Sequence, residues 1–172
     1  GKGSEYNCTI DLKKAERENH AEDKHEVKIA RENKTASSGE FSDKKILVVE
    51  DNRINMLLVK TLLKSILPGS TILEAFDGTK AIKMYKKEKP NFILMDIQMP
   101  YKNGYETTAE IRLLKKYNKT PIIALTAGIV LGEKEKCLEL GMDDYVSKPI
   151  VRSKLEEALY KWLKKESQNE NK

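Results

Sequence analysis

The chain has 172 residues, enough for one ordinary domain with some excess or for two small domains. Hydrophobic residues make up 39% of the sequence and charged residues 34%, so part of the chain is expected to be unfolded or strongly solvated. The formal net charge of +5 is interleaved with acidic residues and forms no basic arm, which argues against a nucleic-acid-binding protein. No apolar run approaches the length of about 20 residues that a bilayer requires, and no signal-peptide core is present, so we expect no direct membrane contact.

The two cysteines, Cys8 and Cys137, lie far apart and lack the close spacing of a metal site. Reduced thiols of this kind are typical of cytosolic proteins. We therefore expect a cytoplasmic location, with any membrane anchor of a longer protein lying in upstream segments.

Residues 1–12 alternate weakly, with Tyr6, Cys8 and Ile10 on one side, which predicts a single strand without a partner. The Gly-x-Gly-Ser sequence followed by this alternation resembles the closing glycine box and last strand of the ATP-binding domain of a histidine kinase. A cloning remnant followed by a linker is the alternative. In both cases the nucleotide pocket would lie upstream, so residues 1–12 are not expected to bind ATP.

Residues 13–43 contain almost no large apolar side chains, the exceptions being Val27, Ile29 and Phe41. Such a segment cannot bury enough surface to offset the entropy lost on ordering. We predict a flexible, charged and largely disordered linker with transient helix around 13–33.

From Lys44 onward, short apolar runs alternate with helical patterns, and turn residues separate them. The predicted strands are 45–49, 71–75, 92–96, 121–125 and 144–147. The predicted helices are roughly 54–66, 78–88, 104–116, 132–140 and 151–165. This alternation indicates an α/β fold of flavodoxin-like type, a doubly wound five-stranded parallel sheet of order 2-1-3-4-5 with five helices. The domain is predicted to span 44–166, with a disordered tail at 167–172.

Polar and charged side chains follow four of the five strands: Glu50, Asp51, Asp96, Thr126 and Lys148. Asp96 alone could be an ordinary turn residue. In the predicted order, however, the first and third strands are neighbours, and the carboxyl ends of parallel strands form the ligand-binding edge. Three carboxylates brought together there repel one another unless a cation lies between them. Because the ligands are oxygens only, we expect Mg²⁺.

Lys148 offers a mobile positive charge suited to a phosphoryl group, and the Thr126 hydroxyl offers a hydrogen bond. With Asp96 these groups describe a carboxylate nucleophile that accepts a phosphoryl group.

Residues 44–165 resemble a receiver domain of two-component signalling, with four motifs in the right order and at the right spacing. The motifs are Val-Val-Glu-Asp-Asn (48–52), Met-Asp-Ile-Gln-Met-Pro (95–100) followed by Gly104, Ala-Leu-Thr-Ala (124–127) and Asp-Tyr-Val-Ser-Lys-Pro (144–149). The resemblance implies that Asp96 is the phosphoacceptor and that Glu50 and Asp51 hold Mg²⁺ with it. The backbone carbonyl of Gln98 would complete the protein ligands.

The same resemblance implies that Thr126 and Tyr145 form the switch pair of the family. Lys148 would be its phosphate-binding lysine, placed by a cis Lys148–Pro149 peptide bond. No motif position is missing, which argues against a receiver that has lost phosphorylation.

Glu50–Asp51–Asn52 together with Asn55 looks most like a receiver fused behind a histidine kinase. The implied partners are the dimerisation and phosphotransfer helices of such a kinase or a histidine phosphotransfer protein. No kinase core lies in this chain, and its own chemistry would be phosphotransfer to aspartate and self-dephosphorylation. The last predicted helix ends near the C-terminus, so no DNA-binding output domain is expected. A docking module of the same fold without phosphate turnover and a stand-alone response regulator are the alternatives.

Positions at 3- and 4-residue steps in the first predicted helix are expected to face the sheet. These are Asn55, Leu58, Val59, Leu62 and Ile66. The positions expected to turn outward are Arg53, Met56, Leu57, Lys60 and Lys64. Because apolar surface rimmed by lysines marks partner sites, we predict a docking surface formed by Met56, Leu57 and Lys60.

Overall fold

In the computed structural model of the chain, the described residues are 43–114, 119–127 and 133–170. The segments interpreted as a kinase remnant (1–12) and, except for its last residue, as a linker (13–43) lie outside these residues.

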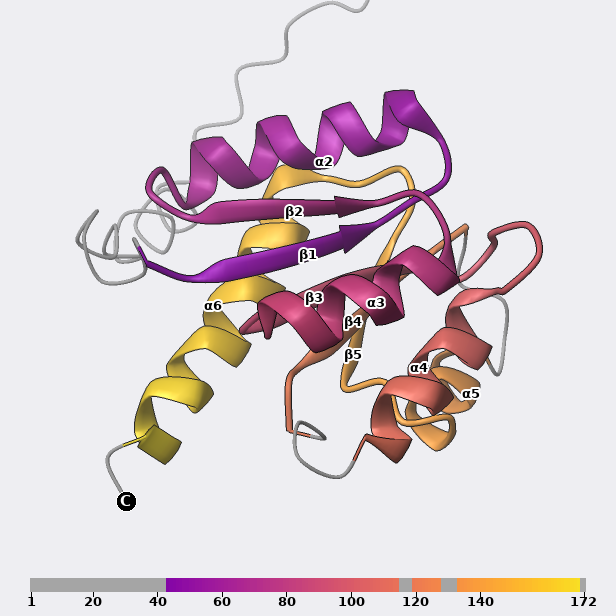
Figure 1. Cartoon of the computed structure of the whole chain (residues 1–172). Helices are drawn as coiled ribbons and strands as arrows, with labels where there is room; N and C mark the ends of the chain where they lie inside the picture. The colour runs from indigo at the N-terminus through magenta and orange to yellow at the C-terminus, as the bar shows by residue number, and fades with distance from the viewer. Residues whose placement is uncertain (1–42, 115–118, 128–132, 171–172) are drawn as a thin grey trace, which may run out of the picture. The chain divides into compact units, whose positions relative to one another are not determined.

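Within the described part, five parallel strands form one sheet of order β2-β1-β3-β4-β5 (Figure 1). The strands are β1 (Lys45–Val49), β2 (Thr71–Ala75), β3 (Phe92–Asp96), β4 (Ile122–Thr126) and β5 (Asp144–Ser147). The predicted fold class and strand order are confirmed. The reversal of strand order lies between β1 and β3, so the residues that follow these two strands meet at one edge of the sheet.

Two helices cover one face of this sheet and three cover the other (Figure 1). The labels, as in the figure, are α2 (Arg53–Ile66), α3 (Gly78–Glu88), α4 (Gly104–Leu113), α5 (Glu133–Glu139) and α6 (Arg152–Glu170). Helices α2 and α6 pack together with one set of strand side chains, and α3, α4 and α5 pack with the other. None of the helices among the described residues is long and apolar enough to cross a membrane.

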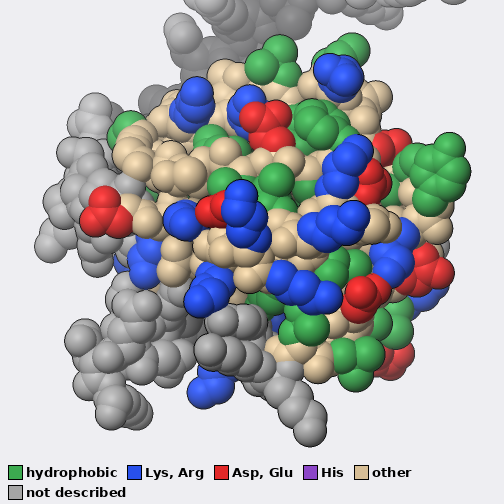
Figure 2. Space-filling model, in the orientation of Figure 1, with side chains coloured by type: hydrophobic (Ala, Val, Ile, Leu, Met, Phe, Trp, Pro, Cys, Tyr) green, Lys and Arg blue, Asp and Glu red, His purple; other side chains and the backbone are tan. Residues whose placement is uncertain are grey.

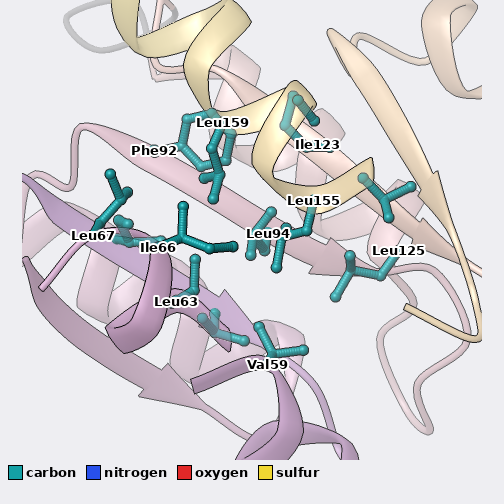
Figure 3. Close-up of a cluster of buried hydrophobic side chains, with 14 of the residues drawn as sticks. Val59, Leu63, Ile66, Leu67, Phe92, Leu94, Ile123, Leu125, Leu155 and Leu159 are labelled. Carbon is teal, nitrogen blue, oxygen red and sulfur yellow. The ribbon is translucent and has the colours of Figure 1, made fainter. Parts of the chain in front are cut away.

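The three central strands, β1, β3 and β4, are almost continuously apolar, as expected of strands that are covered on both faces. In β1, Ile46 and Val48 point to the layer of α2 and α6, whereas Leu47 and Val49 point to the opposite layer. All four side chains are fully buried. Figure 3 shows the first layer, in which the side chains of α2 and α6 meet those of β3 and β4.

The first helix begins immediately after the predicted site residues because Asn52 caps it. The Asn52 side-chain oxygen accepts hydrogen bonds from the backbone N–H groups of Ile54 (2.8 Å) and Asn55 (3.2 Å). Helix α4 begins in the same way, with a capping box between Asn103 and Glu106. These caps fix the direction in which the chain leaves the sheet after β1 and after β3.

The predicted orientation of α2 is wrong for several residues. Its buried side chains are Met56, Val59, Leu63 and Ile66. Met56, expected to face outward, is only 2% exposed, whereas Leu58, expected to face the sheet, is 45% exposed. Apolar residues occur on more than one side of α2. Periodicity alone therefore did not distinguish the observed orientation of the helix from one rotated by about one residue about its axis.

The last helix is longer than predicted. Helix α6 continues to Glu170, so residues 167–170 are helical and do not belong to a disordered tail. Neither glycine nor proline occurs between Lys161 and Lys172 to stop the helix. The other helix and strand bounds differ from the predicted ones by at most three residues.

Candidate functional site

Three carboxylates gather where β1 and β3 end. One oxygen from each of Glu50, Asp51 and Asp96 lies within 4.8 Å of the others. Glu50 is completely buried and Asp96 is 4% exposed, whereas Asp51 is exposed to solvent. The cluster predicted from the strand order is therefore formed, with two carboxylates inside the protein and one at its surface.

Glu50 is held in place by three hydrogen bonds. Its Oε1 atom accepts from the backbone N–H of Asn52 (3.2 Å) and from the side-chain amide of Asn55 (3.1 Å). Its Oε2 atom accepts from the Lys148 ammonium at 2.7 Å. The role of Asn55 was not predicted beyond its place on the helix face toward the sheet, although a helical amide five residues after a strand-end glutamate is a signal that could have found it.

Lys148 links two of the carboxylates. Its Nζ atom lies 2.7 Å from Glu50 Oε2 and 2.9 Å from Asp96 Oδ2. Its backbone N–H donates to the Thr126 carbonyl at 2.6 Å, which fixes the start of the loop after β5. The Lys148–Pro149 peptide bond is cis, as predicted.

The surroundings of the ion pair change both pKa values. Burial raises the pKa of Asp96 to about 6; the hydrogen bond from Lys148 acts in the opposite direction, and the charge of Glu50 adds to the rise. Burial alone would lower the pKa of Lys148, but its hydrogen bonds to Glu50 and Asp96 outweigh burial and raise it. The lysine therefore stays charged, while the carboxylate beside it is destabilised.

The loop after Asp96 returns close to the end of β3. The backbone N–H of Gln98 donates to Asp96 Oδ1 (3.2 Å), and that of Gly104 donates to the Ile97 carbonyl (3.0 Å). A Cβ atom on Gly104 would lie 2.2 Å from the Asp96 carbonyl oxygen, so no side chain fits there. The first residue of α4 is thus in direct contact with the backbone of the candidate nucleophile.

The model of the response regulator receiver domain family matches residues 46–160. This range covers more than half of the chain and includes all four strand-end sites. The chain belongs to the response regulator receiver family.

Several relatives contain similar receiver sequences. Hybrid signal transduction histidine kinase I of Dictyostelium discoideum is 45% identical in an alignment of 121 positions that covers 66% of this chain and 7% of that protein. Histidine kinase 5 of Arabidopsis thaliana is 32% identical in an alignment of 150 positions that covers 72% of this chain and 16% of that protein. The chain therefore spans only a small part of the length of these relatives.

Two solved structures are similar at the level of the whole receiver. The receiver domain of the sensor histidine kinase PA1611 from Pseudomonas aeruginosa, solved with a magnesium ion in its active-site cleft, has 37% identity and a TM-score of 0.64, covering 70% of this chain and 98% of that one. The receiver domain of Ssk1 from Saccharomyces cerevisiae was solved with the histidine phosphotransfer protein Ypd1; the match has 29% identity and a TM-score of 0.64, covering 70% and 88%.

The donor set of this receiver domain suits Mg²⁺. The cluster of Glu50, Asp51 and Asp96 offers carboxylate oxygens only, which are the ligands of a hard cation. Asp51 is open to water, so a cation there could keep part of its hydration shell. The residues present therefore fit the metal expected from the sequence.

The two predicted switch residues lie on adjacent strands of the receiver domain. Thr126 ends β4, is 3% exposed and pairs in register with Ser147. Tyr145 pairs with Ala124, and its half-buried side chain packs against the apolar layer of α3, α4 and α5. The geometry thus places Thr126 at the level of the site and Tyr145 two residues before it on the neighbouring strand.

Of the three residues predicted to form the docking surface, only Leu57 is well exposed. Leu57 is 63% exposed, but Met56 is buried, and Lys60 is half-buried in an ion pair with Glu74. Sequence reasoning missed Ile54, which is 78% exposed at the start of α2. The exposed apolar surface of α2 consists of Ile54, Leu57 and Leu58, which we call the α2 apolar surface.

Proposed function

We propose that this receiver domain accepts a phosphoryl group from a phosphohistidine onto Asp96 and then passes it to another histidine or loses it by hydrolysis. The observation that carries the proposal is the buried Asp96 carboxylate, which contacts Lys148 at 2.9 Å and lies within 4.8 Å of two further carboxylates. A structural ion pair would not need a third carboxylate beside the two that Lys148 contacts, since the surplus negative charge is destabilising.

In the transfer step, a carboxylate oxygen of Asp96 bonds to phosphorus while the bond from phosphorus to the histidine nitrogen breaks, and the imidazole keeps the electron pair. Asp96 must be deprotonated to attack. The Lys148 ammonium stabilises the carboxylate before the reaction and lies close enough to bind a phosphoryl oxygen afterwards. The buried Thr126 hydroxyl is proposed to donate to the same phosphoryl group, and Tyr145 to respond to it as the second switch residue.

Glu50, Asp51, Asp96 and the backbone carbonyl of Gln98 are the proposed Mg²⁺ ligands. The cation would supply positive charge that lets the phosphoryl group approach three carboxylates. The hydrogen bonds from Asn52 and Asn55 leave Glu50 one orientation, so the site is prepared before any ligand arrives.

The proposed protein context is a hybrid histidine kinase, supported by the identity of 45% to a Dictyostelium protein of that name. Residues 1–12 would then be the end of its ATP-binding domain. We place the chemistry in the cytoplasm, where the ATP that charges a kinase histidine is available. The partner would be a helix that bears a histidine, as a phosphotransfer protein or kinase helix pair provides.

The test of the phosphoacceptor uses Asp96→Asn, with Asp43→Asn as a matched exchange at an exposed aspartate. Acid-labile phosphate is measured after incubation with acetyl phosphate or a phosphohistidine donor and Mg²⁺. We expect no incorporation into Asp96→Asn, none into the natural sequence in EDTA, and full incorporation into Asp43→Asn. Full labelling of Asp96→Asn, or labelling that EDTA leaves unchanged, would disprove the assignment.

The proposed docking surface for the histidine-bearing helix is the α2 apolar surface beside Asp51, in place of the set that included Met56. Replacing Ile54 and Leu57 by lysine should slow transfer from a protein donor at least about tenfold, or ~1.4 kcal/mol, and leave labelling by acetyl phosphate unchanged. The matched control replaces Leu113 and Leu138, exposed apolar residues on α4 and α5, by lysine. A slower transfer in the control alone would move docking to that side of the domain.

A further inference from the structure

A groove of about 350 Å³ runs between the edge strand β2 and helix α3, away from the carboxylate cluster. Leu73 from β2 and Met84 from α3 form its apolar floor. Lys80, Lys83 and Lys87, spaced three and four residues apart along α3, line its rim. Figure 2 shows this face, on which Lys and Arg side chains are numerous and hydrophobic and acidic side chains lie scattered among them.

The backbone of β2 is available along the outer side of the groove. Among the described residues, β2 pairs only with β1. Thr71 donates its N–H to the Lys44 carbonyl, and Ala75 accepts from the N–H of Glu50, so both residues turn their backbone groups toward β1. Because backbone groups alternate along a strand of a parallel sheet, Ile72 and Glu74 turn theirs away from it.

The charge around the groove is positive after its own ion pairs are counted. Three carboxylates lie there, and each already has a lysine: Glu74 pairs with Lys60, Asp77 with Lys80 (2.9 Å) and Glu88 with Lys45 (3.3 Å). Lys87 also approaches Glu88, at 3.5 Å, with its side chain 82% exposed. Lys83 is exposed and takes part in none of the ion pairs found among the described residues. The surplus lysines can therefore pair with carboxylates of a partner.

We propose that this groove binds an extended peptide segment of alternating acidic and apolar residues, which adds to the sheet as a strand beside β2. The backbone groups of Ile72 and Glu74 that turn away from β1 would pair with the segment. One apolar side chain would occupy the floor at Leu73 and Met84, and neighbouring acidic side chains would reach Lys83 and Lys87. An unpaired strand edge provides hydrogen bonds for a peptide backbone, whereas neither a nucleic acid nor a lipid surface uses it. The proposal does not depend on phosphoryl transfer at Asp96.

The first experiment titrates the full chain into a fluorescein-labelled octapeptide of alternating Asp and Val, blocked at both ends, at low salt. We expect saturable binding that weakens at least about fivefold in 0.5 M NaCl, because exposed charge pairs are screened. Lys83→Glu with Lys87→Glu should weaken it at least about tenfold. The matched control, Lys64→Glu with Lys164→Glu, changes two exposed lysines outside the groove and should alter the affinity less than about twofold.

The second experiment distinguishes strand addition from simple charge attraction. Hydrogen exchange followed by NMR should show that the peptide protects the amides of Ile72 and Glu74 and leaves those of Thr71 and Ala75 unchanged. The same peptide with N-methylated backbone amides keeps its charges but cannot pair as a strand, so it should not bind measurably. Absence of binding, binding without protection of Ile72 and Glu74, equal binding of the N-methylated peptide, or tighter binding of oligothymidylate or phosphatidylserine vesicles would overturn the proposal.

Discussion

The two ends of the sheet differ in how completely their charged side chains are paired. At the carboxyl end, Glu50 and Asp96 are buried and share the single Lys148 ammonium. At the amino end, the Arg112 guanidinium donates to the carbonyls of Thr120 and Gly141 at 2.8 Å each and to Asp143 Oδ2 at 2.6 Å. Asp143 in turn accepts from the backbone N–H of Ile122.

The pKa values follow this difference. Burial raises the pKa of Asp96 to about 6, because the hydrogen bond from Lys148 lowers this pKa by less than burial raises it. Asp144, at the amino end of β5, is also partly buried, but hydrogen bonds from Lys161 and Trp162 outweigh burial and lower its pKa. The amino end is thus built for stability, whereas the carboxyl end keeps unfavourable charge that a reaction can use.

The largest effect on stability is expected at the amino end, from Arg112→Ala. Loss of the guanidinium removes bonds to two carbonyls and leaves Asp143 without its charged partner, so the free energy of unfolding should fall by about 3 kcal/mol. Urea denaturation followed by circular dichroism measures it. Arg152→Ala, which removes a half-exposed arginine, should cost less than about 1 kcal/mol. Equal losses in the two variants would contradict the proposed role of Arg112.

At the carboxyl end, Asp96→Asn should stabilise the fold. An aspartate whose pKa is raised on folding binds its proton more tightly in the folded state, so stability falls as the pH rises from 3.8 to about 6. Removing the charge should therefore increase the free energy of unfolding by about 2 kcal/mol at pH 7.5 in EDTA. The gain should shrink as the pH falls through this range and vanish well below pH 3.8, where the aspartate is protonated in both states. A variant that is less stable at neutral pH would show that Asp96 is stabilising.

The smallest effect is expected for Asp144→Asn, with the opposite dependence on pH. The lowered pKa of Asp144 means that its contribution is complete above pH 3.8 and is lost as the pH falls through the folded-state value. The substitution should cost about 1 kcal/mol at pH 7 and progressively less in acid. Denaturation curves at several pH values test this, and a cost independent of pH would rule out the ion pair with Lys161 as its source.

The gathering of the three carboxylates could be predicted from the sequence because it follows from the strand order. Once β1 and β3 are neighbours, Glu50, Asp51 and Asp96 must meet, whatever the details of packing. The buried face of α2 could not be predicted in the same way, because the exposed residues Ile54, Leu57 and Leu58 are as apolar as the buried ones. Which stripe is buried depends on contacts with α6 and the sheet, which leave no periodic signal in α2 itself.

The Arg112 contacts were also beyond sequence reasoning. The partners of Arg112 lie up to 31 residues away, in the turns before β4 and β5, and none belongs to a recognisable motif. An exposed arginine near the end of a helix is ordinarily read as a favourable charge at the helix dipole. Only the folded chain shows that it joins α4 to the starts of two strands.

Helix α4 is consequently held by contacts at both of its ends, one of them at the nucleophile. At its first residue, Gly104 contacts the backbone of Asp96 and Ile97 without room for a side chain, so a shift of that backbone must displace the start of the helix. At its far end, Arg112 donates hydrogen bonds to the carbonyls of Thr120 and Gly141. Any change in the Asp96 backbone therefore acts directly on the start of α4, while hydrogen bonds tie its far end to the turns before β4 and β5.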